Sequence, residues 1–376
     1  MTQCFRSLAD RTATAVLAIV IFAVVVVVPV AATGAGEVTD GTDTPVHTVT
    51  DALDRSVAVP TPPQRIVAAG RAVLMIADVL YAFDRAPRHI VGLGRISQGR
   101  GSFVAALEDT GGGPTILERS VGPEQIAALR PDLVVLKSSV RDPLGRRLEE
   151  IGVTVVYVDL ETPQQYRRDI TMLGEALGEE ERAAELVAFY ERRVADVQAR
   201  TVPIPSRERP GTLVLAARAG DDGVAFQVPP TDWIQTRMVE LAGGNPVWIG
   251  ANPGGGWATV GFEQIAAWDP EQIIVVAYDG SAPAIRNRLG SDPRWMALTA
   301  TAAGNLHAMP MDFYSWDQPD TRWILGLQWM ATRLHPDLFR DISVRDEVTE
   351  FYREVYHLSD RAITATIEPT LTGDVD

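Results

Sequence analysis

Short apolar runs alternate with segments of helical periodicity through most of the chain. Arg65–Ala69, His89–Leu93 and Leu133–Leu136 have the length and composition of buried strands, and each is followed by turn residues or by a polar segment. Between them, Val73–Phe83 and Arg146–Ile151 carry apolar residues at helical spacing. Strands and helices that alternate with short turns favour a parallel sheet with helices on both faces. The pattern therefore predicts an α/β fold.

An eight-residue pattern occurs twice in the chain, 139 residues apart. Val121–Ala128 and Val260–Ala267 are identical at seven of eight positions, and each copy leads into a proline and then into an apolar run. A solenoid repeat would have a period of about 20 to 50 residues. The repeat instead predicts two doubly wound α/β lobes with parallel sheets. The alternative is a chance match between two common helix–proline–strand segments.

The segment between the two copies has a different composition. It contains no strand pattern: Thr162-Pro163 begins a helix, Gly178 interrupts it, and Glu179–Arg200 is rich in Ala, Glu, Arg and Leu at helical spacing. A helix of about 20 residues is about 30 Å long, enough to join two lobes rigidly. An ordinary surface helix of one lobe is the alternative.

The predicted organisation follows from these features. We expect a signal peptide at 1–32, a flexible leader at 33–45, an N-terminal α/β lobe at 46–162, a long inter-lobe helix at 163–202, a C-terminal α/β lobe at 203–360 and a loose tail at 361–376. A small hairpin around Asp54-Arg55 is expected to open the N-terminal lobe.

The N-terminus has the three regions of an export signal. Arg6 and Arg11 precede the apolar run Ala13–Val28, and small residues that permit cleavage after Ala32 or Ala35 follow. We therefore expect the mature protein to be periplasmic or otherwise extracytoplasmic.

Retention of the apolar segment as a membrane anchor is the alternative, because about 20 residues suffice to span a bilayer. Cys4 precedes the apolar run, so it cannot be the lipidated cysteine of a lipoprotein signal. After cleavage the chain would have no cysteine, and hence no disulfide and no thiolate metal site.

Composition and motifs narrow the function classes. The net charge of −15 argues against binding to nucleic acid, although it permits a local basic pocket. Arginine supplies every basic residue except Lys137. No G-x-S-x-G, H-E-x-x-H, P-loop or intact G-x-G-x-x-G motif follows a predicted strand, so we expect no enzyme and no intrinsic cofactor. None of the five histidines pairs at helical spacing, which disfavours a site for a bare transition-metal ion.

Several segments, in this order, carry a family resemblance. They are Val49–Arg55 before Pro63–Val67, then Gly122–Val135, Leu173–Gly178, and Trp323–Gly326 followed by Leu334–Phe339. From about His47 to Leu358 the chain resembles the periplasmic solute-binding proteins of iron-siderophore and cobalamin ABC importers. The resemblance implies a monomer of two lobes joined by a long helix, a ligand bound in the cleft between them, and little hinge motion. It also implies a partner, an ABC permease dimer in the membrane with its cytoplasmic ATPase.

The repeat supplies two residues that match the docking positions of that family. There, one acidic residue on each lobe docks onto arginines of the permease, and the matching positions here are Glu124 and Glu263. A carboxylate near a helix N-terminus is favoured by the helix dipole, and surface charge pairs orient partners at an interface. The alternative is that both are ordinary helix N-terminal carboxylates.

Candidate ligand residues follow the predicted strands, because ligands of open α/β sheets bind beyond the carboxyl ends of the strands. Those of the N-terminal lobe are Arg71, Arg95, Lys137, Ser138 and Arg141. Those of the C-terminal lobe are Arg218, Trp257, Tyr278, Tyr314, Trp316 and Arg322. Their basic groups suit an anionic ligand or the anionic groups of a chelate, and their aromatic rings suit a bulky organic ligand.

We therefore predict a binding protein that captures a metal chelate of the Fe(III)-siderophore or corrinoid type and delivers it to a permease. Haem and a tetrahedral oxyanion such as molybdate or tungstate are alternative ligands. Two alternatives of a different class are an exported chelate-modifying enzyme and a membrane-tethered sensor.

Overall fold

The computed structural model of the protein describes residues 45–107, 113–220, 223–252 and 254–375. The predicted signal peptide, and the leader up to residue 44, lie outside these ranges. Among the described residues, no helix is long and apolar enough to cross a membrane. The chain from residue 44 onward forms one compact unit.

The described chain begins with the predicted hairpin. Strands β1 (Val46–Thr50) and β2 (Ser56–Pro60) pair in antiparallel orientation. The Asp51 carboxylate fixes the turn, because it accepts hydrogen bonds from the backbone N–H of Leu53 (3.0 Å) and from the Arg55 guanidinium (2.7 Å). The prediction of a hairpin around Asp54-Arg55 is confirmed.

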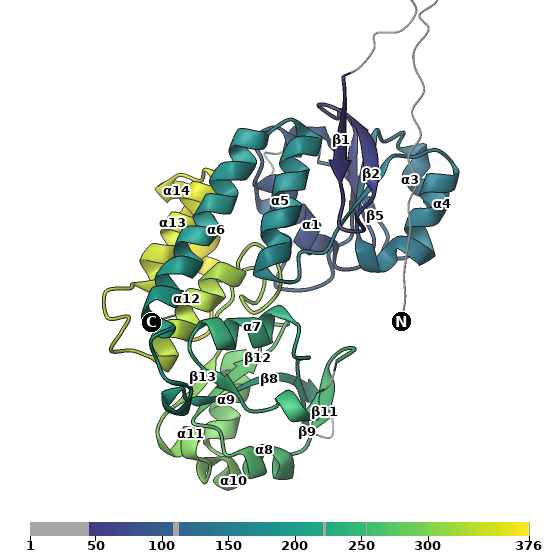
Figure 1. Ribbon diagram of the computed structural model, residues 1–376. Helices are drawn as coiled ribbons and strands as arrows, with labels where there is room; N and C mark the ends of the chain where they lie inside the picture. The colour runs from purple at the N-terminus through teal and green to yellow at the C-terminus, as the bar shows by residue number, and fades with distance from the viewer. Residues whose placement is uncertain (1–44, 108–112, 221–222, 253, 376) are drawn as a thin grey trace, which may run out of the picture. The chain divides into compact units, whose positions relative to one another are not determined.

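Five parallel strands form the first sheet, in the order β5-β4-β3-β6-β7. Their bounds are β3 Ile66–Ala68, β4 Ile90–Gly94, β5 Thr115–Leu117, β6 Leu133–Lys137 and β7 Val155–Val158. The helices between them are α1 Val73–Tyr81, α2 Phe103–Leu107, α3 Pro123–Ala128 and α4 Arg146–Glu150. We call this sheet with these helices the N-terminal lobe (Figure 1).

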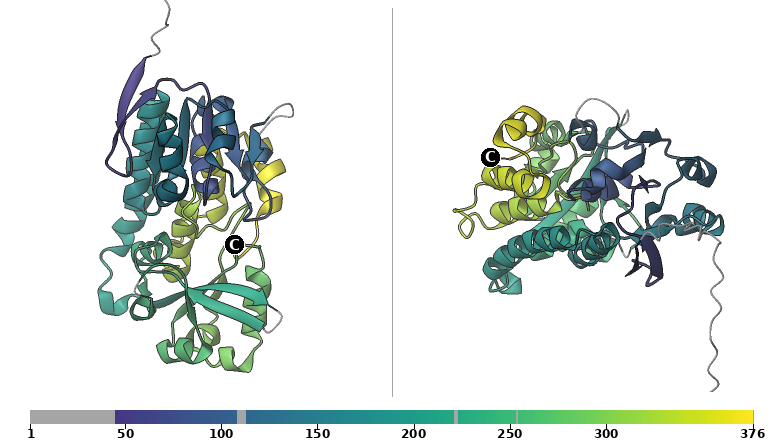
Figure 2. Two further views of the ribbon diagram at one scale, coloured as in Figure 1. Left: turned by 90° about the vertical axis from the view of Figure 1, so that its right-hand side faces the viewer. Right: turned by 90° about the horizontal axis from the view of Figure 1, so that it is seen from above.

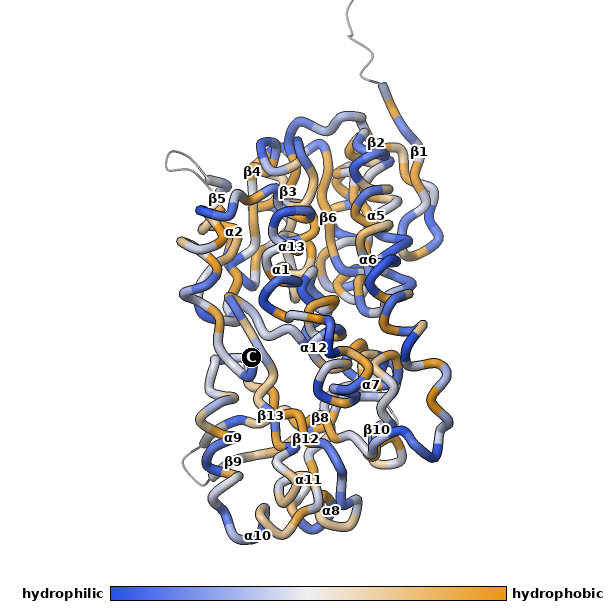
Figure 3. Tube along the Cα trace, turned by 90° about the vertical axis from the view of Figure 1, so that its left-hand side faces the viewer, coloured by the Kyte–Doolittle hydropathy of each residue, from blue (hydrophilic) through white to orange (hydrophobic). Residues whose placement is uncertain are grey.

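The side chains of β6 show why its sequence is apolar throughout. Leu133 and Val135 belong to one hydrophobic cluster, and Val134 and Leu136 belong to a second. Successive side chains of a strand point to opposite faces, so both faces of this sheet are buried. Hydrophobic residues are accordingly concentrated on the strands in Figure 3.

Two helices follow the first sheet. They are α5 (Pro163–Leu177) and α6 (Glu180–Thr201), separated by Gly178, which ends α5 in the left-handed conformation at φ 67°. Near the start of α6, Arg182 Nε donates to the carbonyl oxygen of Ala82, at the end of α1, at 3.0 Å. At the end of α6, the Thr201 hydroxyl donates to the carbonyl oxygen of Leu241 at 2.8 Å. Helix α6 therefore reaches from the N-terminal lobe to the end of α7 (Ile234–Leu241) (Figure 1).

The second sheet mixes parallel and antiparallel strands, in the order β11-β9-β8-β12-β13, with β10 also pairing with β8. The bounds are β8 Gly211–Gly220, β9 Gly223–Val228, β10 Asn245–Pro246, β11 Ala258–Val260, β12 Gln272–Val276 and β13 Leu306–Ala308. Strands β8, β12 and β13 are parallel, whereas β9 is antiparallel to both β8 and β11. The sequence pattern did not predict β9, and Figure 2 shows it beside β8.

Eight α-helices are described in the rest of the chain. They are α7 Ile234–Leu241, α8 Phe262–Trp268, α9 Ala282–Gly290, α10 Pro293–Met296, α11 Thr299–Ala302, α12 Trp323–Leu334, α13 Val344–Tyr356 and α14 Asp360–Ala362. We call the second sheet with the helices from α7 onward the C-terminal lobe. One hydrophobic cluster runs from the first sheet through α5 and α6 into this lobe. The predicted class, a two-lobed α/β fold, is confirmed.

The two copies of the repeat have matching backbones. Gly122 and Gly261 cap α3 and α8 in nearly the same extended conformation, with φ, ψ of −85°, 163° and −92°, 165°. Strands β6 and β12 follow at the same offset of 139 residues that separates the sequence copies. The repeat therefore corresponds to one helix–strand unit in each lobe.

The C-terminal residues correct one prediction, the loose tail from 361 onward. Ile363 and Ile367 are buried in the main hydrophobic cluster. The Trp329 indole N–H donates to the carbonyl oxygen of Asp374 at 2.6 Å, and the Asp374 carboxylate lies 3.0 Å from Arg286. Apolar residues within a polar segment thus anchor this end of the chain to the C-terminal lobe.

Candidate functional site

The carboxyl ends of β4 and β12 meet through the loop Ser97–Ser102. The backbone N–H of Gly99 donates to the carbonyl oxygen of Tyr278 at 3.3 Å, and that of Arg100 donates to Phe313 at 2.9 Å. A loop that leaves the N-terminal sheet therefore contacts the end of a C-terminal strand. We use the term strand-end region for six residues near the ends of strands in the two sheets: Arg71, Arg100, Arg141, Arg218, Trp257 and Tyr278.

Two of its arginines belong to adjacent strands of the N-terminal sheet. Arg71 comes after β3 and Arg141 after β6, and these strands are parallel neighbours. A Cβ atom on Gly70 would lie 3.2 Å from the Val140 side chain, so the two segments are in close contact. Arg71 is exposed.

Arg141 is half-buried, and its Nε is a buried donor without a hydrogen-bond partner among the described residues. The nearest carboxylate, Glu149, lies 3.9 Å from that Nε. Glu149 already accepts from Arg55 at 2.7 Å and from the Tyr157 hydroxyl at 2.6 Å. Arg141 therefore retains capacity to bind an anion.

The C-terminal lobe contributes a cation beside aromatic rings. Strands β8 and β12 are parallel with Ala216 opposite Val276. Tyr278 comes just after β12, and Arg218 lies in the part of β8 that extends beyond this pairing, so both are at the same edge of the sheet. The ring of Trp257 lies edge-on to that of Tyr278, with centroids 6.3 Å apart. No ion pair joins the exposed Arg218 to a carboxylate within the described ranges; its charge helps to lower the pKa of Asp279, after the larger effect of the Ser281 hydroxyl.

A buried carboxylate holds the Tyr278 side chain. The Tyr278 hydroxyl donates to Asp317 Oδ2 at 2.9 Å, and Gln235 donates to the same oxygen at 3.2 Å. The Ser315 hydroxyl donates to Asp317 Oδ1 at 2.6 Å. Burial raises the pKa of Asp317 to about 6, although these hydrogen bonds lower it. The Tyr278 side chain is therefore held at its hydroxyl end by Asp317, and its ring lies edge-on to that of Trp257.

Three predicted ligand residues form pairs within the protein. The Lys137 side chain is buried and lies 2.6 Å from the Glu161 carboxylate. The Ser138 hydroxyl donates to the Asp159 carboxylate. Arg95 forms an exposed pair with Glu118 at 2.7 Å, which lowers the pKa of that carboxyl.

The predictions for Tyr314, Trp316 and Arg322 are corrected, because none of the three side chains is exposed. The Trp316 indole N–H donates to Asp312 at 3.2 Å, and Arg322 binds both Asp312 and Asp78. The aromatic, proline-marked sequence predicted a surface loop. The Tyr314 ring instead lies 5.1 Å from the centre of the buried Arg322 guanidinium, and Trp316 is fully buried.

Sequence reasoning missed Arg100. It lies in a Gly-Arg-Gly sequence whose glycines, Gly99 and Gly101, have φ of 80° and 120°. Glycine on both sides of an arginine was the available signal for a tight loop that presents a charge. Arg100 lies within a polar segment of the sequence, and that polar composition alone did not single it out.

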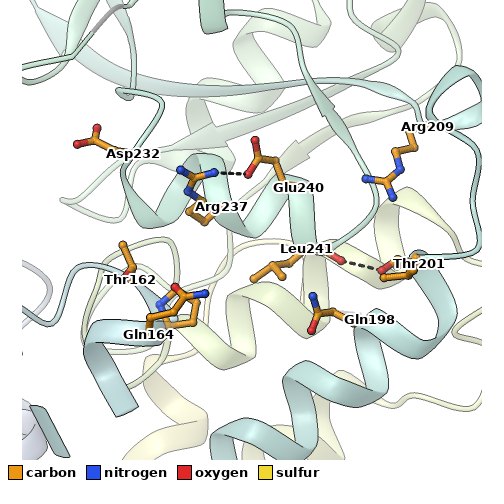
Figure 4. Close-up of a pocket in the computed structure, with 11 residues that line it drawn as sticks. Thr162, Gln164, Gln198, Thr201, Arg209, Asp232, Arg237, Glu240 and Leu241 are labelled. Atoms are coloured by element: carbon orange, nitrogen blue, oxygen red, sulfur yellow. Dashed lines mark hydrogen bonds and ion pairs between the residues drawn. The ribbon is translucent and has the colours of Figure 1, made fainter. Parts of the chain in front are cut away.

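Two cavities lie elsewhere, and none of the predicted ligand residues lines them. The larger, of about 540 Å³, is shown in Figure 4 and is lined by residues of α5, α6 and α7 and the loops beside them. The smaller, of about 280 Å³, lies between α5 and α6. In the larger cavity Arg237 is paired with Glu240 at 2.8 Å. Arg209 also lines this cavity and donates Nε to the carbonyl oxygen of Ile204 at 3.3 Å. The strand-end region is the stronger candidate, because it contains four guanidinium groups without a carboxylate partner within hydrogen-bonding distance among the described residues, whereas the larger cavity contains only Arg209.

The strand-end region carries arginine rather than metal-ligand side chains. Across the described parts of the chain, no group of three or more His, Cys, Asp or Glu residues is placed to hold a metal ion.

The two predicted docking residues have the same local geometry. Glu124 and Glu263 are exposed residues of the first turns of α3 and α8. Each carboxylate folds back over its capping glycine, and Oε2 lies 3.0 Å and 3.3 Å from the Cβ positions of Gly122 and Gly261. Within the described residues neither forms an ion pair.

Sequence comparison finds related proteins over most of the chain. The model of a family described as periplasmic binding protein matches residues 109–312. The molybdate-binding protein MolA of Haemophilus influenzae is 24% identical over 340 residues, covering 83% of this chain and 91% of that protein. An uncharacterized ABC transporter substrate-binding lipoprotein of Bacillus subtilis, YvrC, is 23% identical over 299 residues, covering 78% and 87%.

Solved structures share the fold. An ABC transporter solute binding protein from Sulfurospirillum deleyianum superimposes with a TM-score of 0.69 at 22% identity, covering 85% of this chain and 98% of that one. The TroA-like periplasmic binding protein FepB from Veillonella parvula has a TM-score of 0.65 at 17% identity, covering 84% and 97%. At these identities the likeness concerns the fold alone.

Proposed function

Because the chain belongs to the periplasmic binding protein family, we propose that it captures an anionic metal chelate for an ABC importer. The chain is an ABC transporter substrate-binding protein, as its family and its relatives indicate. The proposed ligand is a chelate of the Fe(III)-siderophore or corrinoid type. The protein acts outside the cytoplasm as a monomer and delivers the ligand to a permease with its ATPase.

One observation carries the proposal for the ligand. Arg71, Arg100 and Arg141 follow strands of the N-terminal sheet, and Arg218 lies near the end of β8 in the C-terminal sheet. None of the four forms a hydrogen-bonded carboxylate pair with a described residue. Guanidinium groups bind carboxylate and other oxyanions through paired N–H donors. The rings of Trp257 and Tyr278, on the C-terminal lobe, supply flat apolar surface for an organic ligand.

Molybdate or tungstate is the second candidate ligand. The relative MolA is described as molybdate-binding and aligns with most of this chain. The same unpaired guanidinium groups would suit a tetrahedral oxyanion. The aromatic rings favour the chelate, because a small oxyanion has no apolar surface to place against them.

A thermal-shift screen followed by calorimetric titration tests the ligand. The probes are a ferric tricatecholate, cobalamin, haem, molybdate and tungstate. A ligand at 100 times its dissociation constant should stabilise the protein by about 2.7 kcal/mol. Stabilisation by the tricatecholate but not by molybdate is expected; stabilisation by molybdate alone would establish the second candidate. Recovery of a chemically altered chelate would instead indicate an enzyme.

Matched variants connect binding to the strand-end region. Arg218→Gln removes one charge there, and Arg288→Gln removes an exposed charge from α9 as the control. Affinity should fall about tenfold or more in the first variant and stay unchanged in the second, because one charge-assisted hydrogen bond is worth about 1.5–3 kcal/mol. Equal affinity in both would place the ligand elsewhere.

Glu124 and Glu263 are the proposed contacts with the permease. Their equivalent places in the repeat, their exposure and their lack of described ion-pair partners support this role. The double variant E124R/E263R should abolish ligand uptake in cells while ligand affinity stays intact. The control E175R/E181R makes the same charge change on α5 and α6. Loss of affinity in E124R/E263R would show that these residues maintain the fold or the ligand site.

A further inference from the structure

The loop Ser97–Ser102 belongs to the N-terminal lobe but is seated on the C-terminal lobe. We propose that this loop is an arm that presents Arg100 to the ligand, so that ligand binding strengthens the contact between the lobes. The inference rests on the proposed function, since it concerns an anionic ligand at the strand-end region. Neither a role for Arg100 nor a ligand-dependent contact between the lobes was predicted from the sequence.

Two backbone hydrogen bonds seat the arm. The donors, the N–H groups of Gly99 and Arg100, come from the segment after β4. The acceptors are the carbonyl oxygens of Tyr278, just after β12, and of Phe313. Because main-chain groups form both hydrogen bonds, these bonds fix the backbone position of Arg100 independently of its side chain.

The loop can form these two backbone hydrogen bonds only with glycine at position 99. Gly99 has φ 80°, and a Cβ atom there would overlap the carbonyl oxygen of Phe313. That oxygen belongs to the backbone of a buried segment, so it cannot move aside as a flexible side chain would. Close approach of the two backbones therefore requires the absence of a side chain.

Gly280 provides the complementary surface on the C-terminal lobe. It has φ 85°, and a Cβ atom there would lie 2.9 Å from Arg100 Cδ. The aliphatic part of Arg100 thus packs against the turn that follows Tyr278.

The guanidinium of Arg100 is available for a ligand. Arg100 is exposed, and no ion pair with it is formed in the part of the chain that the structure describes. An anion bound by Arg100 together with Arg218 would bridge the arm and the C-terminal lobe. A ligand that binds more tightly when the loop contacts the C-terminal lobe also stabilises that contact. By thermodynamic linkage, the contact raises ligand affinity by the same factor.

Affinity measurements on two variants test the arm. Arg100→Gln should lower affinity for a ferric tricatecholate, or for molybdate if that is the ligand bound, about tenfold or more. Gly99→Ala should lower affinity comparably although Arg100 is retained. Arg288→Gln is the surface control and should bind like the natural protein. Unchanged affinity in Arg100→Gln would overturn the inference while leaving the proposed function intact.

Hydrogen exchange provides a readout that does not depend on the variant's affinity. In the natural protein, saturating ligand should slow exchange of the Gly99 and Arg100 amides at least several-fold, and Arg100→Gln should lose this slowing. Equal slowing in both proteins would show that the ligand does not act through Arg100. Failure of the natural protein to bind any anionic probe would overturn the proposed function, and this inference with it.

Discussion

Asp78 and Arg322 form a fully buried ion pair between residues 244 positions apart in the sequence. Asp78 lies on α1 of the N-terminal lobe, and Arg322 precedes α12. The Arg322 guanidinium also lies 2.6 Å from Asp312, and its centre is 4.3 Å from the Phe103 ring. The contact between the lobes is therefore built around a charge and not only around apolar side chains.

Replacement of Arg322 by methionine should destabilise the protein strongly. The substitution keeps much of the volume but leaves Asp78 and Asp312 buried without their cation, and breaking such a pair costs about 3–5 kcal/mol. The midpoint of urea unfolding should fall accordingly. Arg340→Met, in an exposed pair with Asp337, should change stability by less than about 1 kcal/mol. A comparably small loss in Arg322→Met would show that the buried pair contributes little.

Stability should depend on pH through the buried carboxyls. Burial raises the pKa of Asp317 from about 3.8 to about 6, so between these values the folded state binds more protons than the unfolded state. Protonated Asp317 therefore contributes to the free energy of unfolding at low pH, and this contribution is lost as the pH rises through about 6. The loss is on the order of 3 kcal/mol. Asp78 acts in the same direction, because burial raises its pKa to about 6 despite the opposing charge of Arg322.

The matched variant Asp317→Asn isolates this effect. Burial lowers the pKa of His307 to about 4, which makes stability rise with pH over the same range and masks the carboxyls. Both proteins contain His307, so its effect cancels in their difference. The stability of the natural protein minus that of Asp317→Asn should decrease from pH 4 to pH 6.5. For Asp279→Asn the difference should instead increase with pH, and mainly below about pH 4, because hydrogen bonding to Ser281 lowers the pKa of Asp279 below its usual value. A flat difference for Asp317→Asn would contradict the pKa shift.

Glu179 should anchor the start of α6. Its carboxylate accepts hydrogen bonds from the backbone N–H groups of Asp84 (2.9 Å), Arg85 (3.1 Å) and Ala86 (3.2 Å). Glu179→Gln replaces one acceptor oxygen by a donor and removes the charge, so we expect a loss of about 1.5–3 kcal/mol in urea unfolding. Glu180→Gln, at the exposed neighbouring position, should cost less than about 1 kcal/mol. Similar losses in the two variants would reject a specific anchor at Glu179.

Removal of residues 372–376 should destabilise the C-terminal lobe. The truncation deletes the acceptor of the buried Trp329 indole N–H and the partner of Arg286. An orphaned buried donor alone costs about 1–3 kcal/mol. Unfolding followed by tryptophan fluorescence should show a loss of at least that size. An unchanged midpoint would restore the prediction of a loose tail.

Local features of the fold were predictable because they depend on neighbours in sequence. The hairpin of β1 and β2 follows from a turn at Asp54 between two alternating runs. The repeat fixed the offset between β6 and β12, since each copy encodes a complete helix–strand unit. Strand β9 was missed because the short run Gly223–Val228 does not by itself show a partner strand, and its pairing with β8 arises only in the folded sheet.

The candidate site was predictable only in part. The order of the strands places Arg71, Arg141, Arg218 and Tyr278 at strand ends, and periodicity predicts those ends. Whether a charged residue at a strand end is paired depends on which carboxylates from other segments lie within reach in the folded chain. Lys137 ends β6 and Arg141 follows it four residues later, yet Glu161 lies 2.6 Å from Lys137 whereas a donor of Arg141 stays unpaired.

The sequence by itself determined the class of fold, the two related lobes and the positions of Glu124 and Glu263 at the starts of equivalent helices. These follow from periodicity, capping and repetition, which act over a few residues. Only the tertiary structure decided that Arg322 is buried against Asp78 and that Arg100 is seated on the opposite lobe. Both outcomes depend on contacts between segments about 180 residues or more apart, and the desolvation or pairing of a charge is set by such contacts.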